Sequence, residues 1–373
     1  MKKKIISLLI ALTLFLPSSC FAATSYSTKP NDEYFSLQKK AFDLVGVREV
    51  WGKGMYGKYK KKAPIVAVID TGVTKHADIK NILKGQGITS SKVSSRYSDI
   101  DYQGTSIAGI IAAKNNNKIG ISGLMPDAVI YPIKIFSVGD YGEITSNQSC
   151  LAQAIYSAVS KNVDVINLSL GTPIKNSKVE KAIKYANEKK IIVVASCGDS
   201  DNSTILYPAA YDKVVSVSAV TDKLKKQKYS NYNSTVDITA PGDNIPCTIP
   251  SGSIGENLID VGYSLNSGTA YSTAYVSALA AMYKAMKPNG NYSGFVKMLK
   301  NTAFDIGSSG KDTKFGYGLI DFSNAYSYLK GNENCEHKYG KWKTLIKKTG
   351  NSYGLKKRTC TKCLFTQKMY VLK

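Results

Sequence analysis

Two parts of the sequence carry side chains whose type and spacing could do chemistry. The first is Asp70, which closes the apolar run PIVAVID (64–70) and precedes Thr71 and Gly72. A carboxylate at the carboxyl end of a buried strand is a candidate site residue, because ligands of parallel sheets bind beyond that end of the strands. The alternative for an isolated Asp-Thr-Gly is a carboxylate that caps the following turn.

The second part is the C-terminal tail, which holds three of the seven cysteines. Cys335 and His337 form C-x-H, Cys360 and Cys363 form C-x-x-C, and 22 residues separate the two pairs. Together they make a complete four-ligand set for tetrahedral zinc, which predicts a small zinc-ribbon-like module. One disulfide plus one free thiol is the alternative, because an oxidising exterior favours disulfides.

The elements that would position Asp70 alternate between strand and helix from residue 63 to residue 330. Strands are expected at 64–70, 128–136, 163–171, 191–198 and 214–220, and helices at 104–113, 146–162, 179–190 and 269–287. This alternation predicts an α/β fold with a central parallel sheet and helices on both faces.

The ends of the chain differ from this central part. Residues 1–22 have the basic start, the apolar run and the small residues of a signal peptide, so the mature protein is expected to be secreted. Residues 23–62 are expected to form an N-terminal extension, 63–330 the main domain, 331–334 a linker and 335–373 the Cys/His module. No later apolar run approaches about 18 residues, so no transmembrane segment is predicted.

The chain is strongly basic, with a formal net charge of +23 from 50 Lys+Arg against 27 Asp+Glu. Only Arg48, Arg96 and Arg358 are arginines, and lysine is less suited than arginine to forked recognition of phosphates or bases. The charge either keeps a solvated surface soluble or attracts the protein to an anionic cell-wall polymer. No nucleic-acid-binding motif is present, so nucleic acid is not an expected partner.

A series of short motifs runs in a fixed order from residue 31 to about residue 330. The motifs are NDEYFSLQ (31–38), IDTGV (69–73), QGTSIAG (103–109), VINLSLG (165–171), VVASCGDS (193–200), YPAAY (207–211), YSNY (229–232), ITAPG (238–242), SGTAYSTAYV (267–276) and GYGLID (316–321). This ordered set resembles the subtilase family of serine peptidases. The resemblance implies a subtilisin-like three-layer α/β sandwich around a central parallel sheet.

The resemblance also implies the catalytic positions, and this sequence departs from the family at three of them. Subtilases use a serine nucleophile, a histidine base and an aspartate that orients the base. Asp70 matches the aspartate, but Gln103 stands at the histidine position, Ala270 at the serine position and Asp199 at the asparagine of the oxyanion hole.

These departures affect different steps of catalysis. Gln103 can donate a hydrogen bond to Asp70 but cannot take up a proton near neutral pH, and Ala270 has no nucleophilic atom. The carboxylate of Asp199 would repel the negative oxygen that develops during peptide cleavage. The chain is therefore expected to be a catalytically inactive member of the family, a pseudopeptidase.

Some binding features that the resemblance implies are retained. Ser169, Leu170 and Gly171 match the family strand that pairs with substrate backbone, and Gly139 and Gly142 lie near the opposite strand. An extended peptide could lie between them by strand addition. The alternative is that these residues are kept for folding alone.

The resemblance also implies a calcium site. Asn117 would supply a side-chain oxygen, Ile119 and Ile121 would supply carbonyls, and Asp78 and Gln38 would complete the set. Oxygen ligands of this kind suit calcium. The alternative is an ion-free turn in the loop 115–123.

The predicted function is that of a secreted subtilase homologue that binds a peptide or protein without cleaving it, as a regulator of an active subtilase or as a scaffold. One alternative is a residual or unconventional endopeptidase in which Asp70 has another partner. Another is a basic adhesin that associates with the cell wall.

Overall fold

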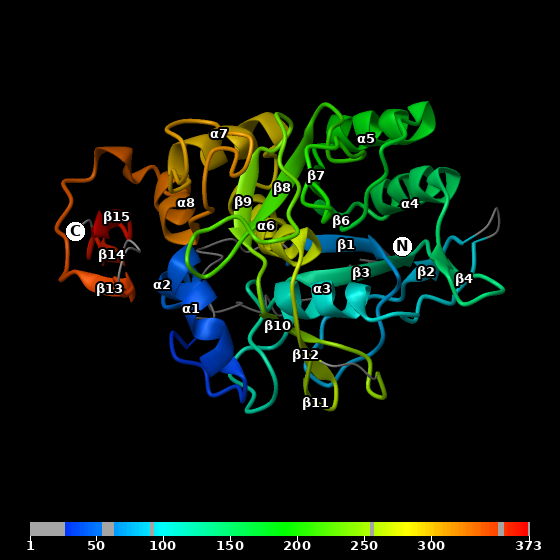
Figure 1. Ribbon diagram of the computed structural model, residues 1–373, viewed down its shortest axis with the longest axis horizontal. Helices are drawn as coiled ribbons and strands as arrows, with labels where there is room; N and C mark the ends of the chain where they lie inside the picture. The colour runs from blue at the N-terminus through cyan, green and yellow to red at the C-terminus, as the bar shows by residue number, and fades with distance from the viewer. Residues whose placement is uncertain (1–26, 54–62, 90–92, 254–256, 350–353, 372–373) are drawn as a thin grey trace, which may run out of the picture.

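A seven-stranded, fully parallel sheet forms the centre of the molecule (Figure 1). The computed structural model describes residues 27–53, 63–89, 93–253, 257–349 and 354–371. In spatial order the strands are β2 (Gln86–Gly87), β3 (Val129–Lys134), β1 (Ile65–Asp70), β6 (Val165–Leu168), β7 (Ile192–Ser196), β8 (Val214–Val220) and β9 (Ile238–Pro241). After β1 the chain forms β2 and β3 on one side of β1, and then crosses to β6 on the other side. The carboxyl ends of β1 and β6 therefore flank a topological switch point, where such sheets bind ligands.

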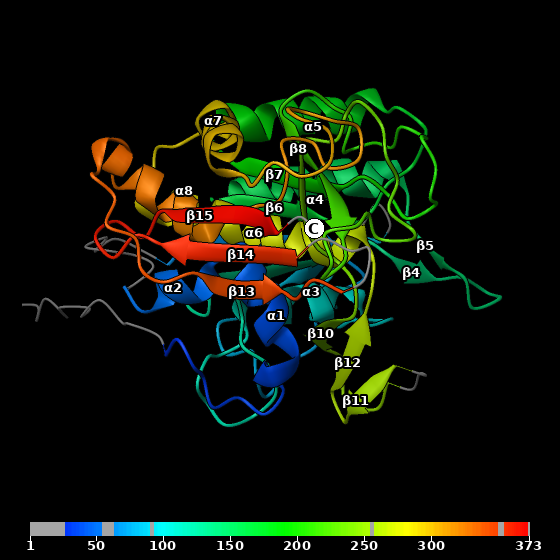
Figure 2. The same cartoon turned by 60° about the vertical axis from the view of Figure 1, so that its left-hand side comes forward.

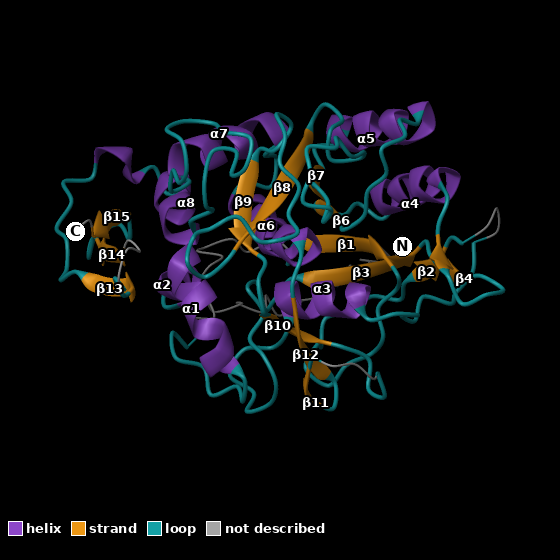
Figure 3. Ribbon diagram, in the orientation of Figure 1, coloured by secondary structure: helices purple, strands orange, loops and turns teal. Residues whose placement is uncertain are grey.

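Helices cover both faces of this sheet, which gives three layers (Figure 3). On one face lie α4 (Gln148–Ser160) and α5 (Ser177–Glu188). On the other lie α1 (Phe35–Val45), α2 (Val47–Trp51), α3 (Gln103–Ala112), α6 (Thr269–Met286), α7 (Tyr292–Thr302) and α8 (Phe322–Leu329). The alternation of side chains along β1 separates the two cores, because Val66 and Val68 join the second group of helices while Ala67 and Ile69 join the first.

Helix α6 is the most enclosed element, because all of its residues are buried. Its apolar and small side chains surround the whole helix, which is the pattern of a core helix rather than of a surface helix. A ligand can therefore reach the N-terminus of α6 only where the surrounding loops leave it accessible.

Smaller sheets extend from this body. β10 (Ile245–Thr248), β12 (Tyr263–Asn266) and β11 (Leu258–Asp260) form an antiparallel sheet, and β4 (Ser137–Val138) pairs with β5 (Ile144–Thr145) in a hairpin. In the tail, the 3-10 turn η1 (Asn332–Asn334) precedes an antiparallel sheet of β13 (Lys343–Ile346), β14 (Gly354–Thr359) and β15 (Thr366–Val371). Figure 2 shows this tail sheet lying across α1, α2 and α8.

The tail is anchored on the main body by apolar and charged contacts. Leu355 belongs to the same buried cluster as α1 and α2. Lys357 Nζ lies 2.7 Å from a carboxylate oxygen of Glu49, and Lys368 Nζ lies 2.6 Å from one of Asp321. The side chains of Lys368 and Asp321 are 2% and 0% exposed, so each charge depends on the other for compensation.

The expected α/β fold with a central parallel sheet is confirmed. Every strand and helix expected from the sequence overlaps an observed one. The expected signal peptide lies outside the described residues. None of the helices in the described part of the chain has the length and apolar character that a membrane span requires.

Candidate functional site

Asp70 and Gln103 form the centre of the candidate site, at the carboxyl end of β1. Asp70 is the last residue of β1 and is fully buried, and Gln103 is the first residue of α3. Gln103 Nε2 lies 3.1 Å and 3.2 Å from the two carboxylate oxygens of Asp70 and 3.0 Å from the carbonyl oxygen of Ser169. The expected hydrogen bond to Asp70 is thus confirmed, and the same amide also links β1 to the end of β6.

A close backbone contact brings these side chains together. Gly72 has φ +119°, and a Cβ on Gly104 would lie 1.9 Å from the carbonyl oxygen of Gly72, so α3 begins directly on the turn after β1. Asp99 fixes the same corner, because its carboxylate accepts hydrogen bonds from the Thr71 hydroxyl (2.7 Å) and the Thr105 backbone N–H (2.8 Å). Sequence reasoning missed Asp99, although an acidic residue just before a helix is a recognisable N-terminal signal.

The carboxyl group of Asp70 is buried without a cationic partner among the described residues. Burial raises its pKa to about 7, and the negative charge of Asp99 adds to the effect. Hydrogen bonds from the Thr71 N–H and from Gln103 oppose this rise in pKa. Asp70 can therefore hold a proton in the neutral range, which an exposed aspartate does not do.

Asp199 caps the N-terminus of α6. Its Oδ1 accepts a hydrogen bond from the Thr269 backbone N–H at 2.8 Å, and its Oδ2 accepts one from the Thr269 hydroxyl at 3.0 Å. The positive end of the helix dipole favours a carboxylate there. Burial of the carboxyl group raises its pKa, and the bonds from Thr269 lower it.

Ala270 follows Thr269 in α6 and is 6% exposed. Its carbonyl oxygen accepts a hydrogen bond from Ser169 Oγ at 3.2 Å, which ties α6 to the end of β6. The structure therefore brings Asp70, Gln103, Ser169 and Ala270 together through hydrogen bonds. The start of α6 offers the carboxylate of Asp199, an acceptor, where an asparagine would offer a donor.

Two nearby side chains, Cys197 and Ser272, are not arranged as nucleophiles. Burial raises the pKa of the Cys197 thiol to about 12, so a thiolate is not available at neutral pH. The hydroxyl of Ser272 donates to carbonyl oxygens of β9 and is directed toward that strand.

The predicted peptide-binding residues lie on two different elements. Ser169, Leu170 and Gly171 follow β6, and among the described residues the backbone N–H groups of Leu170 and Gly171 donate no hydrogen bond. Gly139 and Gly142 form the turn of the β4–β5 hairpin, where their N–H groups donate to the carbonyls of Glu143 and Gly139. Of these two elements, the segment 169–171 is therefore the one that is free to pair with a peptide backbone.

The predicted calcium ligands meet around the loop that follows α3. Asp78 Oδ1 accepts a hydrogen bond from Asn117 Nδ2 at 2.8 Å, and its Oδ2 accepts one from the Ile121 N–H at 2.9 Å. Asn117 Oδ1 accepts from the Ile119 N–H at 3.1 Å. The amide of Gln38 bonds the backbone N–H and carbonyl of the residue after Ile121.

A second carboxylate lies at this loop. Asp32 accepts hydrogen bonds from the backbone N–H groups of Asn116 and Asn117, at 3.0 Å and 2.8 Å. Asp32 and Asp78 are both buried, and neither belongs to an ion pair among the described residues. Two buried carboxylates beside the side-chain amide of Asn117 suit a calcium ion, which would neutralise their charge.

The four predicted zinc ligands converge in the tail. The candidate ligand atoms of Cys335, His337, Cys360 and Cys363 all lie within 4.8 Å of one another, and Cys363 Sγ lies 3.3 Å from His337 Nδ1. Tetrahedral zinc with Zn–S bonds of about 2.3 Å places neighbouring ligand atoms about 3.8 Å apart. A disulfide would not need the histidine among the thiols, so the cluster fits a metal better than it fits the alternative.

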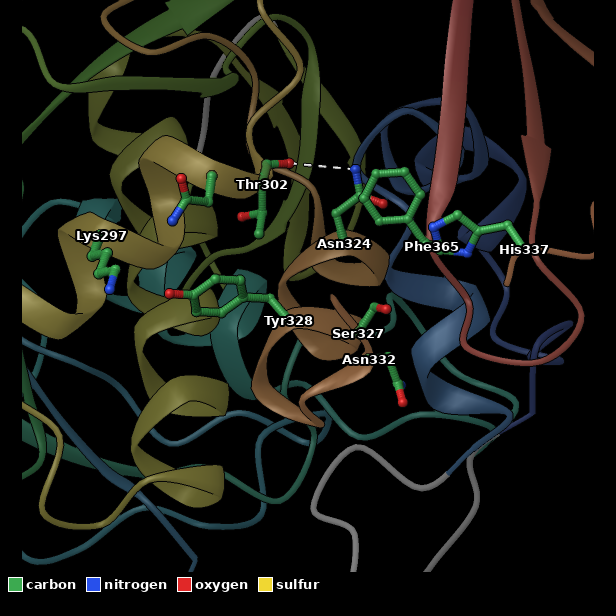
Figure 4. Close-up of a pocket in the computed structure, with 9 residues that line it drawn as sticks. Lys297, Thr302, Asn324, Ser327, Tyr328, Asn332, His337 and Phe365 are labelled. Atoms are coloured by element: carbon green, nitrogen blue, oxygen red, sulfur yellow. Dashed lines mark hydrogen bonds between the residues drawn. The ribbon is translucent and has the colours of Figure 1, made fainter. Parts of the chain in front are cut away.

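A cavity of about 440 Å³ lies where α7 and α8 meet the tail. Figure 4 shows Lys297 and Tyr328 on one side and His337 and Phe365 on the other. The His337 ring stacks on Phe365 with centroids 4.9 Å apart, so the cavity wall contacts one of the candidate zinc ligands. The residues that line this cavity include none of those that form the Asp70–Gln103 site.

Comparisons with known proteins agree with this fold. A protease from Pseudoalteromonas arctica PAMC 21717 has a solved structure that matches with a TM-score of 0.71 and 25% identity, covering 80% of this chain and 99% of that one. The similarity therefore extends over most of the chain rather than over single motifs.

Two curated relatives are proteases. Minor extracellular protease Epr of Bacillus subtilis (strain 168) is 31% identical over 306 residues, which are 82% of this chain and 44% of Epr. Subtilisin BL of Lederbergia lenta is 34% identical over 256 residues, which are 69% of this chain and 88% of that protein. Residues 61–318 match the subtilase family as a whole. The chain therefore belongs to the subtilase family.

Proposed function

We propose that this chain is a secreted subtilase that does not cleave peptide bonds and whose cleft binds an extended peptide or protein segment. One observation carries the proposal: the amide of Gln103 bonds both Asp70 and the Ser169 carbonyl. The resemblance puts Gln103 at the histidine position of the family. An amide held in this way cannot accept a proton from a nucleophile.

The other two departures support the same conclusion. Ala270 offers no atom that could attack a carbonyl, and Asp199 carries a carboxylate at the start of α6. Removing one oxyanion-hole donor costs about 10²–10³ in rate in an active subtilase, and a carboxylate there would add repulsion. Base, nucleophile and oxyanion donor are thus all affected together.

Peptide binding is supported by the segment 169–171. The N–H groups of Leu170 and Gly171 are available to an extended chain, and backbone pairing of this kind needs no catalytic residue. The bound segment would belong to a regulated partner, such as an active subtilase, or to a protein that the chain holds as a scaffold. Secretion is supported by the leader-like residues 1–22 and by similarity to a protease whose name calls it extracellular.

Incubation of the protein with a complex peptide pool, followed by mass spectrometry of new termini, tests the absence of cleavage. We expect no new termini from the wild type or from Asp70→Ala. Cleavage that Asp70→Ala abolishes would instead favour an unconventional peptidase. That alternative has one observation in its favour, because a buried carboxyl with a pKa of about 7 is suited to proton transfer.

Peptide binding requires its own test. Gly171→Pro removes the N–H that would pair with a peptide, whereas the control Gly171→Ala keeps it. The new Cβ of the alanine would lie 3.2 Å from the Leu206 side chain, and a small shift of that side chain relieves this close contact. Peptides captured from the same pool should be lost from Gly171→Pro and retained by Gly171→Ala. Equal retention by both variants would show that binding does not use this edge.

The two metal sites are proposed as structural. Zinc would be held by the cluster in the tail and calcium by the carboxylates and carbonyls around the loop 115–123. Elemental analysis of the purified protein should give about one zinc per chain. Calcium should raise the unfolding temperature of the wild type but not that of Asp78→Asn, and an equal rise in both would place the ion elsewhere.

A further inference from the structure

The tail sheet has one face on the main body and one face on the surface. Side chains alternate between faces along a strand, so Lys357 of β14 and its partner Lys368 of β15 point the same way. Both reach carboxylates of the main body, as described above. Arg358 and its partner Gln367 must therefore lie on the opposite, outward face.

Arg358 is held in place on that outward face. Its guanidinium carbon lies 4.3 Å from the centroid of the Tyr339 ring and 4.8 Å from that of Trp342. Its Nε donates a hydrogen bond to Gln367 Oε1 at 2.7 Å. Contacts with two rings and one amide leave the guanidinium little freedom. The Trp342 side chain is 36% exposed, so these contacts lie at the protein surface.

The surroundings of Arg358 are almost uniformly positive. Residues 335–373 contain ten lysines and one arginine against the single acid Glu336, which gives 11 − 1 = +10 in a chain whose total is +23. Lys341, Lys343, Lys347 and Lys348 are exposed, and no ion pair involves them among the described residues. In the described part of the tail, only Lys357 and Lys368 are paired with carboxylates, on the inward face.

Arginine is rare in this protein, since only three of its 50 basic residues are arginine. A lysine would supply the same charge at this position. A fixed guanidinium differs by presenting two parallel N–H donors, which match the oxygens of a phosphate. Arg48 also lies against a ring, that of Phe35, but it is paired with Asp43, whereas Arg358 has no carboxylate partner among the described residues.

We propose that the outward face around Arg358, Tyr339 and Trp342, together with the exposed lysines 341, 343, 347 and 348 in and beside the edge strand β13, binds a phosphate-bearing polymer of the cell wall. Arg358 takes one phosphate by its forked donors, and the lysines attract the neighbouring phosphates of the same chain. A polymer fits better than a single ion because the charge is spread over many side chains. A wall polymer fits better than a nucleic acid because of the proposed secretion of the protein. Polymer binding by this face does not depend on whether the cleft is catalytic.

The test compares polymers of equal charge on the full-length mature protein. Immobilised poly(glycerol phosphate) teichoic acid, polyglutamate and single-stranded DNA are each titrated with the wild type, Arg358→Lys and Lys189→Ala. Lys189→Ala is the charge control, because this exposed lysine contacts the Tyr185 ring, on α5 of the main body. Thermal unfolding checks that each variant is folded.

We expect the wild type to prefer teichoic acid and Arg358→Lys to weaken that binding about tenfold, through loss of one charge-assisted hydrogen bond. Lys189→Ala should change it less than about twofold at the same salt concentration. Gln367→Ala, which frees the guanidinium without removing it, should give an intermediate loss. Equal binding by Arg358→Lys and wild type, equal affinity for polyglutamate, or tighter binding to DNA would each overturn the proposal.

Discussion

Replacing Asp70 with asparagine should remove a pH dependence of stability that the wild-type protein carries. In the folded chain Asp70 is fully buried, and burial raises its pKa to about 7. In the unfolded chain the pKa returns to about 3.9. Between these two pH values the folded protein binds a proton that the unfolded protein has lost. Stability contributed by this group therefore falls as the pH rises from about 4 to about 7.

The magnitude follows from the width of that window. About three pH units at about 1.4 kcal/mol each give at most about 4 kcal/mol of stability lost by the wild type. Asparagine does not titrate, so Asp70→Asn escapes this loss. The variant also carries a constant cost, because its own amide would face the amide of Gln103, which donates to both carboxylate oxygens in the wild type. The diagnostic quantity is therefore the change with pH, not the offset.

Urea unfolding of both proteins at about pH 4.5, 6.0 and 7.5 measures this change. We expect the free energy of unfolding of Asp70→Asn, minus that of the wild type, to rise by about 2–4 kcal/mol across the series. Asp140→Asn, which removes an exposed carboxylate, controls for net charge. A difference that stays constant within about 0.5 kcal/mol would mean that Asp70 is already ionised at the lowest pH, and the description of an uncompensated buried acid would be refuted.

Three further results are expected. Gln103→Ala should lower the free energy of unfolding, measured with urea at about pH 7.5, by about 1–3 kcal/mol, because Asp70 and the Ser169 carbonyl lose a donor. A smaller loss at about pH 4.5 would agree with a protonated Asp70. Lys368→Met should lower the free energy of unfolding by about 3–5 kcal/mol, and adding Asp321→Asn should recover part of that loss. A double variant as unstable as Lys368→Met alone would argue against a buried ion pair. Zinc chelation should lower the unfolding temperature and expose the tail to protease, and zinc should restore both; indifference to the chelator would favour a disulfide.

The central fold could be predicted from the sequence because its signals are local. Runs such as 64–70 and 214–220 are apolar over most of their length, which a strand buried on both faces requires. The antiparallel sheet of β10, β11 and β12 carries no comparable signal, since β11 is short and partly exposed. The sequence predicted a ribbon-like module in the tail but not the bounds of its strands, because these strands mix lysine with neutral residues and resemble solvated loops until the inward face is known.

The candidate site could be predicted only in part. Asp70, Gln103 and Ala270 follow from motif order, and the four zinc ligands follow from their spacing. The sequence could not show that Gly139 and Gly142 close a hairpin, because glycine suits both a turn and a substrate-facing strand. Nor could it show Arg358 between two aromatic rings, since that contact depends on which face of β14 the main body covers.

Retention of Asp70 has an explanation that needs no catalysis. Its carboxylate accepts hydrogen bonds from the Thr71 N–H and from Gln103, and the amide of Gln103 also holds the Ser169 carbonyl. Replacing Asp70 by an apolar residue would leave buried donors unpaired at the point where β1, α3 and β6 meet, and such donors cost more than the hydrogen bonds themselves contribute. Asp199 has a similar structural role as the cap of α6. A carboxylate at each position can therefore be maintained by the fold, and its presence alone is no argument for peptidase activity.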